Sequence, residues 1–248
     1  MLLPRNANAQ QTEAGWHLHL PAGNTSLYRY AQIDDYTPLP RRRFLWQVGS
    51  TLRLRARVSA SELPGTWGFG FWNDPFSFAL GLGGMGRRLP VLPNCAWFFY
   101  ASPQNYLSFT DHFPGNGFLA QVFSAPRVPS FFLFPALLGF PFLLIKLFSK
   151  WLRAKFARRY IAEESRLLPV EVTTWHDYCL RWDETGTRFS INGEVVFETS
   201  IRPQGPLGLV LWIDNQFAAW RPDGTLSAGF LPNPPAWLEI IALSASRA

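Results

Sequence analysis

Residues 176–199 read HDYCLRWDETGTRFSINGEVVFET, and they decide the fold class. Apolar and polar side chains alternate on both sides of Asn192-Gly193, a dipeptide typical of two-residue β-hairpin turns. A second turn is expected around 183–186. The segment therefore predicts three antiparallel strands joined as a meander.

The same alternation recurs upstream. In TLRLRARV (51–58) the apolar residues face inward and Arg53, Arg55 and Arg57 face outward, which predicts a strand with a solvated arginine row; anion binding by this row is the alternative. Further strands are expected at 16–20, 96–100, 106–109, 118–123, 207–216 and 236–246. Residues 1–15 are expected to be loose, and a Pro/Gly-rich excursion is expected after residue 216.

The stretch PGTWGFGFWNDPFSF (64–78) is the most unusual of these strands. Its alternation places Trp67, Phe69 and Phe71 on one face and Gly68, Gly70, Trp72 and Asp74 on the other. The glycines either leave room for a ligand to approach the backbone or accommodate bulky neighbours. Both explanations remain open at this point.

Composition supports one β-rich domain with an insertion. The 248 residues include 11 Trp, 22 Phe, 21 Pro and 19 Gly, a mixture typical of short strands and tight turns. His17 and His19 share a strand face without a third ligand nearby, and GLGGMG (81–86) is not followed by an amphipathic helix. We therefore expect no metal and no cofactor. Cys95 and Cys179 are expected to be buried free thiols, although pairing stays open.

The insertion reads VPSFFLFPALLGFPFLLIKLFSKWLRAKFARRYI (128–161). No acidic residue lies between Asp111 and Glu163, whereas the window contains the basic residues Arg127, Lys146, Lys150, Arg153, Lys155, Arg158 and Arg159. Because the whole chain carries only +6, its basic character belongs to this segment, and a nucleic-acid-binding surface is not expected.

From Leu144 onward, apolar residues recur at three- and four-residue spacing and predict an amphipathic helix in the plane of a membrane surface. Prolines and Gly139 in the preceding apolar run argue against a straight crossing, so a re-entrant or monotopic segment is predicted. The alternative is a buried core hairpin or an oligomer interface. The expected membrane contacts are Phe131, Phe132, Phe134, Leu137, Leu138, Phe140, Phe142, Leu144, Phe148, Lys150, Trp151, Arg153, Lys155 and Arg158.

This segment divides the chain into a β-sandwich domain (1–125 and 162–248) and a membrane-associating insertion (126–161). The N-terminus has no apolar signal region, and basic residues beside membrane segments favour the cytoplasmic side. We therefore expect the cytoplasmic face of a membrane. The expected partners are membrane lipid or integral membrane proteins, and a glycan or hydrophobic ligand.

The chain resembles the concanavalin A-like lectin/glucanase superfamily, particularly family 16 glycoside hydrolases, in the pattern and order of three segments. These are the run at 65–72, the meander from Trp175 to Phe197 and the closing Pro-Ala-Trp-Leu-Glu-Ile strand. The resemblance covers about 45–125 and 170–245. It implies an all-β, concanavalin A-like jelly-roll sandwich. The family's Glu-x-Asp-x-x-Glu strand is missing: its place reads Asn-Cys-Ala-Trp-Phe-Phe-Tyr-Ala-Ser (94–102), so the family's activity does not carry over.

Two strands each place a Trp and an Asp two residues apart: Trp72/Asp74 and Trp212/Asp214, with Gln216 continuing the second face. Aromatic planes beside carboxylates suit a sugar ring, so these five residues are the predicted ligand contacts. Asp74 and Asp214 are also the candidates for acid/base catalysis if burial raises one pKa; otherwise these are edge-of-core residues with satisfied hydrogen bonds.

The sequence thus predicts a non-catalytic, membrane-associated lectin/glucanase-like module, either an accessory subunit of a membrane assembly or a binder of a membrane glycan. A divergent hydrolase or cyclase-type enzyme for a lipidic or lipid-linked substrate is the alternative. That alternative requires Asp74 and Asp214 to point into one cavity within about 10 Å of each other.

Overall fold

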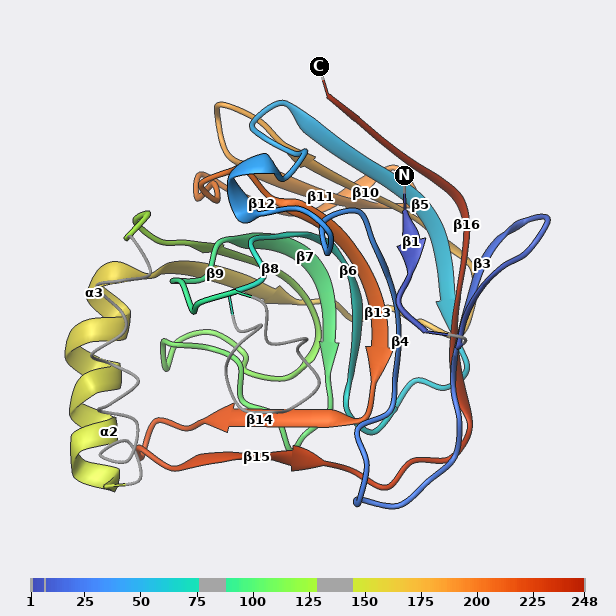
Figure 1. The fold of residues 1–248 in the computed structure, drawn as a ribbon. Helices are drawn as coiled ribbons and strands as arrows, with labels where there is room; N and C mark the ends of the chain where they lie inside the picture. The colour runs from blue at the N-terminus through green and yellow to red at the C-terminus, as the bar shows by residue number, and fades with distance from the viewer. Residues whose placement is uncertain (1, 7, 76–87, 129–144, 248) are drawn as a thin grey trace.

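The computed structural model describes residues 2–6, 8–75, 88–128 and 145–247, and within them two antiparallel seven-stranded sheets pack face to face (Figure 1). Sheet A has the order β1-β4-β13-β6-β7-β8-β9, and sheet B has the order β12-β11-β10-β5-β16-β3-β2. The all-β sandwich expected from the sequence is therefore present.

The strands of sheet A are β1 (Leu3–Pro4), β4 (Tyr30–Asp34), β6 (Thr66–Trp72), β7 (Cys95–Ala101), β8 (Gly117–Ser124), β9 (Ala162–Leu167) and β13 (Gly208–Asp214). Those of sheet B are β2 (Ala9–Gln11), β3 (Gly15–Leu20), β5 (Ser50–Val58), β10 (His176–Trp182), β11 (Thr187–Ile191), β12 (Glu194–Thr199) and β16 (Ala236–Arg247). A 3-10 turn, η1 (Arg41–Arg43), and a two-stranded hairpin, β14 (Gln216–Trp220) and β15 (Leu226–Phe230), complete the β body.

Aromatic side chains from both sheets interleave to form the core. Phe69 of β6 packs edge-on against Tyr178 of β10, with ring centroids 5.0 Å apart. Phe98 of β7 meets Phe189 of β11 at 5.1 Å, also edge-on. All four side chains are buried, so the sandwich is held mainly by apolar burial between its inner faces.

The strand predictions were correct where alternation was strict. Leu52, Leu54, Ala56 and Val58 are buried, and Arg53 and Arg55 are exposed, as expected for β5. The meander forms β10, β11 and β12, with the expected turns between them. Both cysteines are free, and they lie on the outer faces of different sheets; Cys95 is buried, whereas Cys179 is only partly so.

Several predictions for less regular segments were wrong. Residues 106–109 form no strand; Tyr106 makes a single bridge to Ala219 of β14. The segment after residue 216 is a hairpin and not an irregular excursion, because β14 and β15 pair with each other from Gln216–Phe230 to Trp220–Leu226. Residues 1–15 include the short strands β1 and β2, which add to the edges of the two sheets.

The insertion connects two neighbouring strands of sheet A. Ser124, the last residue of β8, lies opposite Ala162, the first residue of β9. The chain therefore leaves and re-enters the sheet at one edge. Residues 129–144, which contain the predicted membrane contacts from Phe131 to Leu144, lie outside the described residues.

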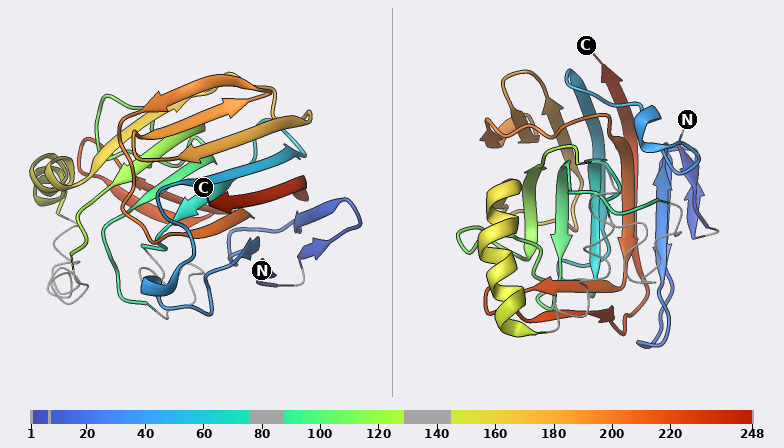
Figure 2. Two further views of the ribbon diagram at one scale, coloured as in Figure 1. Left: turned by 90° about the horizontal axis from the view of Figure 1, so that it is seen from above. Right: turned by 60° about the vertical axis from the view of Figure 1, so that its left-hand side comes forward.

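The described part of the insertion is a helix formed by α2 (Lys146–Leu152), a π-helical turn η3 (Arg153–Ala157) and α3 (Arg158–Tyr160). We call residues 146–160 the insertion helix. Figure 2 shows it nearly end-on at the left of its left-hand view, outside the two sheets. Within the described ranges, the structure contains no helix with the length and apolarity needed to cross a bilayer.

The insertion helix packs on the body through small and polar residues. Ser149 accepts a hydrogen bond from Trp220 Nε1 at 2.9 Å. Arg153 is 2% exposed and donates to the carbonyl oxygens of Trp220 and Ser108 at 3.1 and 2.9 Å, while it pairs with Asp111. Ala157 completes this face in a cluster with buried apolar residues of β7 and β8.

Two expectations for the helix therefore need correction. Arg153, predicted to contact lipid headgroups, is buried and anchors the helix to the loop before β8. Its partner Asp111 also pairs with Arg158 at 2.8 Å, so these two cations have an acidic partner. The reason is tertiary: Asp111 lies 42 residues before Arg153 in the sequence but directly beneath it in the fold.

We predict that Arg153→Gln loosens the insertion helix. The shorter amide leaves the carbonyl oxygens of Trp220 and Ser108, and the half-exposed Asp111, without their cation. Losing a hydrogen bond from a charged donor typically costs about 1.5–3 kcal/mol. Amide hydrogen exchange across 146–160 should accelerate strongly, whereas exchange in β7 and β10 should change little. Arg159→Gln, at an exposed position on the same helix, is the control and should leave exchange unchanged. Equal protection in both variants would contradict the anchoring role.

Candidate functional site

Three tryptophans meet on the face of sheet A that points away from sheet B. Trp72 of β6 stacks on Trp212 of β13, with centroids 6.4 Å apart and an interplanar angle of 9°. Trp97 of β7 lies 5.9 Å from Trp72 and 5.6 Å from Trp212. Each indole is partly exposed, and the buried ring of Phe99 packs beside Trp97 and Trp212. We call these three residues the tryptophan cluster.

The alternation of β6 and β13 produces this cluster. Trp67, Phe69 and Phe71 point into the core, so Trp72 must point outward. By the same rule, Trp212 lies on the outer face of β13, because its neighbours Leu211 and Ile213 are buried on the inner face. Trp72 and Trp212, which the sequence analysis named as ligand contacts on two different strands, are thus brought together by the pairing of β6 with β13.

The two glycines of β6 accommodate bulky neighbours. A Cβ on Gly68 would lie 2.9 Å from the Trp212 ring, and one on Gly70 would lie 2.3 Å from the carbonyl oxygen of Ala96 and 2.6 Å from Trp97 Cβ. Of the two explanations left open by the sequence, this geometry favours the second. The space vacated by the missing side chains is filled by indole and backbone.

Asp214 positions Trp212 through a hydroxyl. Thr66 Oγ1 donates to Asp214 Oδ1 at 2.8 Å and accepts from Trp212 Nε1 at 2.9 Å. Asp214 also accepts from the Thr66 amide, the Tyr28 hydroxyl and the Gln216 amide. Burial raises the pKa of this carboxyl from 3.8 to about 6, although these hydrogen bonds favour its charged form.

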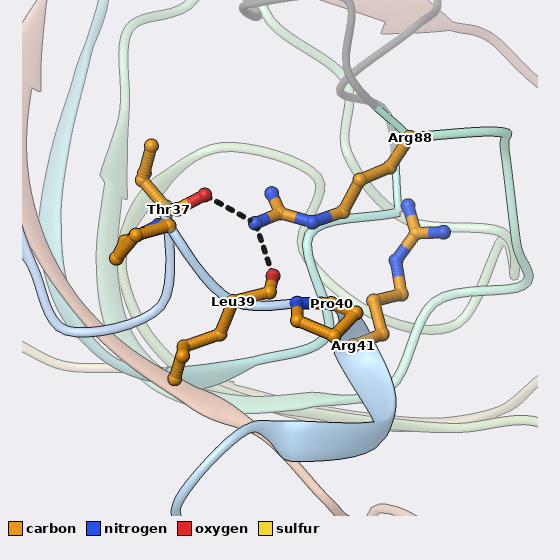
Figure 3. A pocket seen from close by; sticks show the side chains of 6 residues that line it. Thr37, Leu39, Pro40, Arg41 and Arg88 are labelled. Carbon is orange, nitrogen blue, oxygen red and sulfur yellow. Dashed lines mark hydrogen bonds between the residues drawn. The ribbon is translucent and has the colours of Figure 1, made fainter.

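Asp74 has a different role at the other end of β6. Its carboxylate pairs with Arg88, whose guanidinium also donates to the carbonyl oxygens of Thr37 and Leu39 at 2.8 and 2.7 Å (Figure 3). Arg41 lies beside it, bonded to backbone carbonyls, and burial lowers its pKa to about 10. These two arginines line a pocket of about 350 Å³. Asp74 thus holds Arg88 in place, and Arg88 in turn binds the backbone of the loop that contains Thr37 and Leu39.

Asp74 and Asp214 are therefore not brought together. Asp214 lies opposite Thr66, the first residue of β6, whereas Asp74 follows Trp72, the last residue. At about 3.3 Å per residue, the strand alone separates them by roughly 20 Å. Paired glycosidase carboxylates lie within about 10 Å. The hypothesis of a catalytic pair made of these two residues fails on this geometry.

The expected strand 207–216 ends earlier than predicted. β13 stops at Asp214, buried Asn215 binds the backbone of Leu27 and Leu231, and Gln216 begins β14. Gln216 lies opposite Phe230 in the hairpin. It therefore does not continue the Trp212 face, because the chain changes direction at Asn215.

Sequence reasoning missed a polar chain beside the tryptophan cluster. Trp97 Nε1 donates to Gln121 Oε1 at 3.1 Å, and Gln121 contacts Glu163 at 3.4 Å. Glu163 of β9 is buried, accepts the Phe109 amide at 2.7 Å, and has a pKa raised by burial. Trp97 was detectable from the alternation of β7, but Glu163 reaches this face only because β9 pairs with β8 after the insertion.

The arrangement suits binding better than two-carboxylate catalysis. On this side of sheet A, Asp34 pairs with Arg5, Asp74 with Arg88, and both Asp214 and Glu163 accept several hydrogen bonds. Each carboxylate is thus engaged in holding structure. Among the described residues, no cluster of three or more His, Cys, Asp or Glu side chains has the geometry of a metal site.

Comparison with known proteins gives structural similarity only: no protein-family model and no curated protein matches the chain. A glycoside hydrolase family protein from Mycobacterium thermorestibile is 14% identical, with 99% of this chain and 92% of that chain covered and a TM-score of 0.48. The catalytic domain of an endo-1,3-beta-glucanase (laminarinase) from Thermotoga petrophila RKU-1 is 11% identical, with 98% and 81% covered and a TM-score of 0.45. The transglycosylase Crh5 is 11% identical, with 100% and 78% covered and a TM-score of 0.48. Identities of this size leave the activity of this chain unassigned.

We predict that Asp214 makes the protein less stable as pH rises. Its pKa is higher in the folded state than in the unfolded state, so its full stabilising contribution is present below about pH 3.8 and is lost through about pH 6. The loss approaches about 3 kcal/mol, at 1.36 kcal/mol per pKa unit. The free energy of unfolding, measured by urea unfolding from pH 4 to pH 7.5, should therefore fall less with pH in Asp214→Asn than in the wild type, by about this amount.

Asp223→Asn is the control for this titration. Asp223 is exposed and its pKa is lowered by hydrogen bonds to Thr225, so its own titration lies below this pH range. The control should keep the wild-type slope. An unchanged slope in Asp214→Asn would show that the buried carboxyl does not contribute as described.

Proposed function

We propose that this protein docks on an anionic membrane surface through the insertion helix and binds a glycan at the tryptophan cluster, as a non-catalytic β-sandwich of the concanavalin A-like kind. The observation that carries the docking proposal is the outward face of the helix. Its apolar residues point away from the body of the protein instead of into it.

The exposed fractions make this asymmetry clear. Leu147 is 82% exposed, Trp151 is 56% exposed and Tyr160 is 43% exposed, whereas Ser149 and Arg153 on the packing face are almost fully buried. A soluble helix normally buries its large apolar residues and exposes its polar ones. Transferring a large apolar side chain from water contributes about 1.5–3 kcal/mol, so this face would gain by entering lipid.

Cations flank the same face. Lys146, Lys150, Lys155, Arg158 and Arg159 are exposed along the helix. A helix with aromatic and aliphatic residues on one side and cations beside them suits the boundary between acyl chains and headgroups. Each such cation contributes about 1 kcal/mol near an anionic leaflet, which in cells is the cytoplasmic one. We therefore propose the cytoplasmic face, where the apolar run at 129–144 would add further contacts.

The tryptophan cluster supports the second part of the proposal. Trp72, Trp97 and Trp212 are partly exposed on paired strands, and hydrogen bonds through Thr66 and Gln121 hold two of the indoles in place. Aromatic faces with polar groups at their rim suit the apolar face and hydroxyl edge of a sugar. An accessory subunit of a membrane assembly would use the same helix, with an integral membrane protein in place of lipid.

We predict that Leu147→Ser combined with Trp151→Ser weakens binding to vesicles of phosphatidylcholine and phosphatidylserine by at least about tenfold, because two apolar anchors are lost. Lys150→Gln with Lys155→Gln should weaken binding only when phosphatidylserine is present. Flotation of the full-length chain with these vesicles provides the measurement.

Leu27→Ser is the control for vesicle binding. Leu27 is 66% exposed but lies in the loop before β4, away from the insertion helix. It should bind vesicles like the wild type. Equal losses in this control, or a wild type that remains with the soluble fraction, would overturn docking on lipid.

We further predict that Trp212→Ala weakens binding of neutral oligosaccharides about tenfold, whereas Trp212→Phe retains part of the affinity because a ring face remains. Isothermal titration with cellohexaose, laminarihexaose and maltohexaose measures this. Trp175→Ala removes a tryptophan near Arg57 on sheet B and should have no effect. Absence of saturable binding to all three sugars would argue against a neutral glucan as the ligand.

A further inference from the structure

A groove of about 610 Å³ crosses the outer face of sheet B, on the opposite side of the sandwich from the tryptophan cluster. It runs over β16, β5, β10 and β11, which Figure 1 places together at the top of the molecule. Its lining includes Arg53, Cys179, Arg181, Arg188, Ser190 and Ala242, all within the described ranges. The proposed function does not use this surface.

The strand register gathers three arginines in the groove. Arg53 of β5 lies opposite Cys179 of β10, and Cys179 lies opposite Ser190 of β11. Arg181, two residues beyond Cys179 on the same face, lies directly opposite Arg188. Cross-strand neighbours are about 4.5–5.5 Å apart, and like charges in such a pair are destabilising. The fold therefore accepts a repulsive arrangement here.

Acidic neighbours pair with two of these three arginines. Arg181 pairs with the partly buried Asp183 at 3.1 Å, and Arg188 pairs with the exposed Glu198 at 2.8 Å. Arg53 forms no ion pair with any acidic residue that the structure describes. Asp177 is the acidic residue among the described residues of the lining. The lining itself thus holds three arginines and one carboxylate, and Arg53 is the arginine of the three without an ion pair among the described residues.

The wall formed by β16 is locally strained. The register between β16 and β5 shifts between Ile241 and Ser244, and Ala242 adopts a φ of 51°. This left-handed conformation is unfavourable for alanine, and β-bulges often re-aim side chains beside binding sites. The bulge lies in the groove lining, opposite the arginines. This bulge, next to Arg53 in the sheet, is the second independent feature of this site.

We propose that this groove binds a tetrahedral oxyanion, a phosphate or sulfate group, held by Arg53, Arg181 and Arg188. Each guanidinium offers a planar fork of donors that matches two oxygens of such a group. Three forks from three neighbouring strands call for an anion with more than two oxygens, which favours a tetrahedral group over a carboxylate. The Ser190 hydroxyl lies in one cross-strand row with Cys179 and Arg53, two residues from Arg188, and can supply a further donor.

The oxyanion has two sources, the free ion or an ester on a glycan. Isothermal titration of the full-length chain with inorganic phosphate, inorganic sulfate, a heparin-derived hexasaccharide and neutral maltohexaose separates them. We expect saturable binding of phosphate or sulfate that weakens with added sodium chloride. Tighter binding of the sulfated hexasaccharide than of sulfate identifies an ester-bearing glycan, and equal affinity identifies the free ion.

Arg53→Gln should weaken oxyanion binding by at least about tenfold, the loss expected for one charge-assisted hydrogen bond. Arg55→Gln is the matched control: it lies two residues along the same strand face, is exposed, and does not line the groove. Glu198→Gln should tighten binding a few-fold, because it releases Arg188 from its competing carboxylate.

The proposal would be overturned if the wild type bound neither phosphate, nor sulfate, nor the hexasaccharide in a saturable way. It would also be overturned if Arg53→Gln and Arg55→Gln lost the same amount of oxyanion affinity. Vesicle flotation of Arg53→Gln keeps this site separate from the insertion helix and should match the wild type. If Arg53→Gln instead loses vesicle binding, the groove contacts lipid headgroups, and its assignment to a free ion or a glycan ester is wrong.

Discussion

Apolar burial between the two sheets is the constraint on which the rest of the structure depends. Because side chains alternate along a strand, every aromatic residue placed between the sheets assigns its sequence neighbour to an outer face. Phe69 and Phe71 in the core thus direct Trp72 outward, and Leu211 and Ile213 direct Trp212 outward. The tryptophan cluster is a consequence of core packing as much as of its own sequence.

Polar contacts place the insertion helix. A peripheral helix usually docks through its apolar stripe, but here Ser149, Arg153 and Ala157 face the body, and Leu147 and Trp151 face outward. The buried guanidinium of Arg153 donates to the backbone carbonyl oxygens of Ser108 and Thr110 and pairs with Asp111, so it contributes both charge pairing and hydrogen bonding. This inversion leaves the apolar stripe available for a surface outside the protein.

The buried carboxylates of sheet A have structural roles that their sequence pattern does not show. Asp214 was a plausible acid/base group from its pattern, and burial does raise its pKa to about 6. Its oxygens, however, are occupied by Thr66, Tyr28 and Gln216, so it orients Trp212 instead of facing a ligand. Asp74 likewise holds Arg88. A shifted pKa thus marks a structural carboxyl here.

Local sequence alone determined the all-β class, the inner and outer faces of β5, β6 and β10 to β12, the outward position of Trp72 and Trp212, and the localised charge of the insertion. These properties follow from alternation with period two and from composition, which need no knowledge of neighbouring strands. Only the tertiary structure decided that Asp74 and Asp214 lie far apart, that Arg153 is buried on Asp111, and that Arg53, Arg181 and Arg188 share a groove. Those facts depend on which strands pair and in which register, and contacts between residues distant in sequence are invisible to a local pattern.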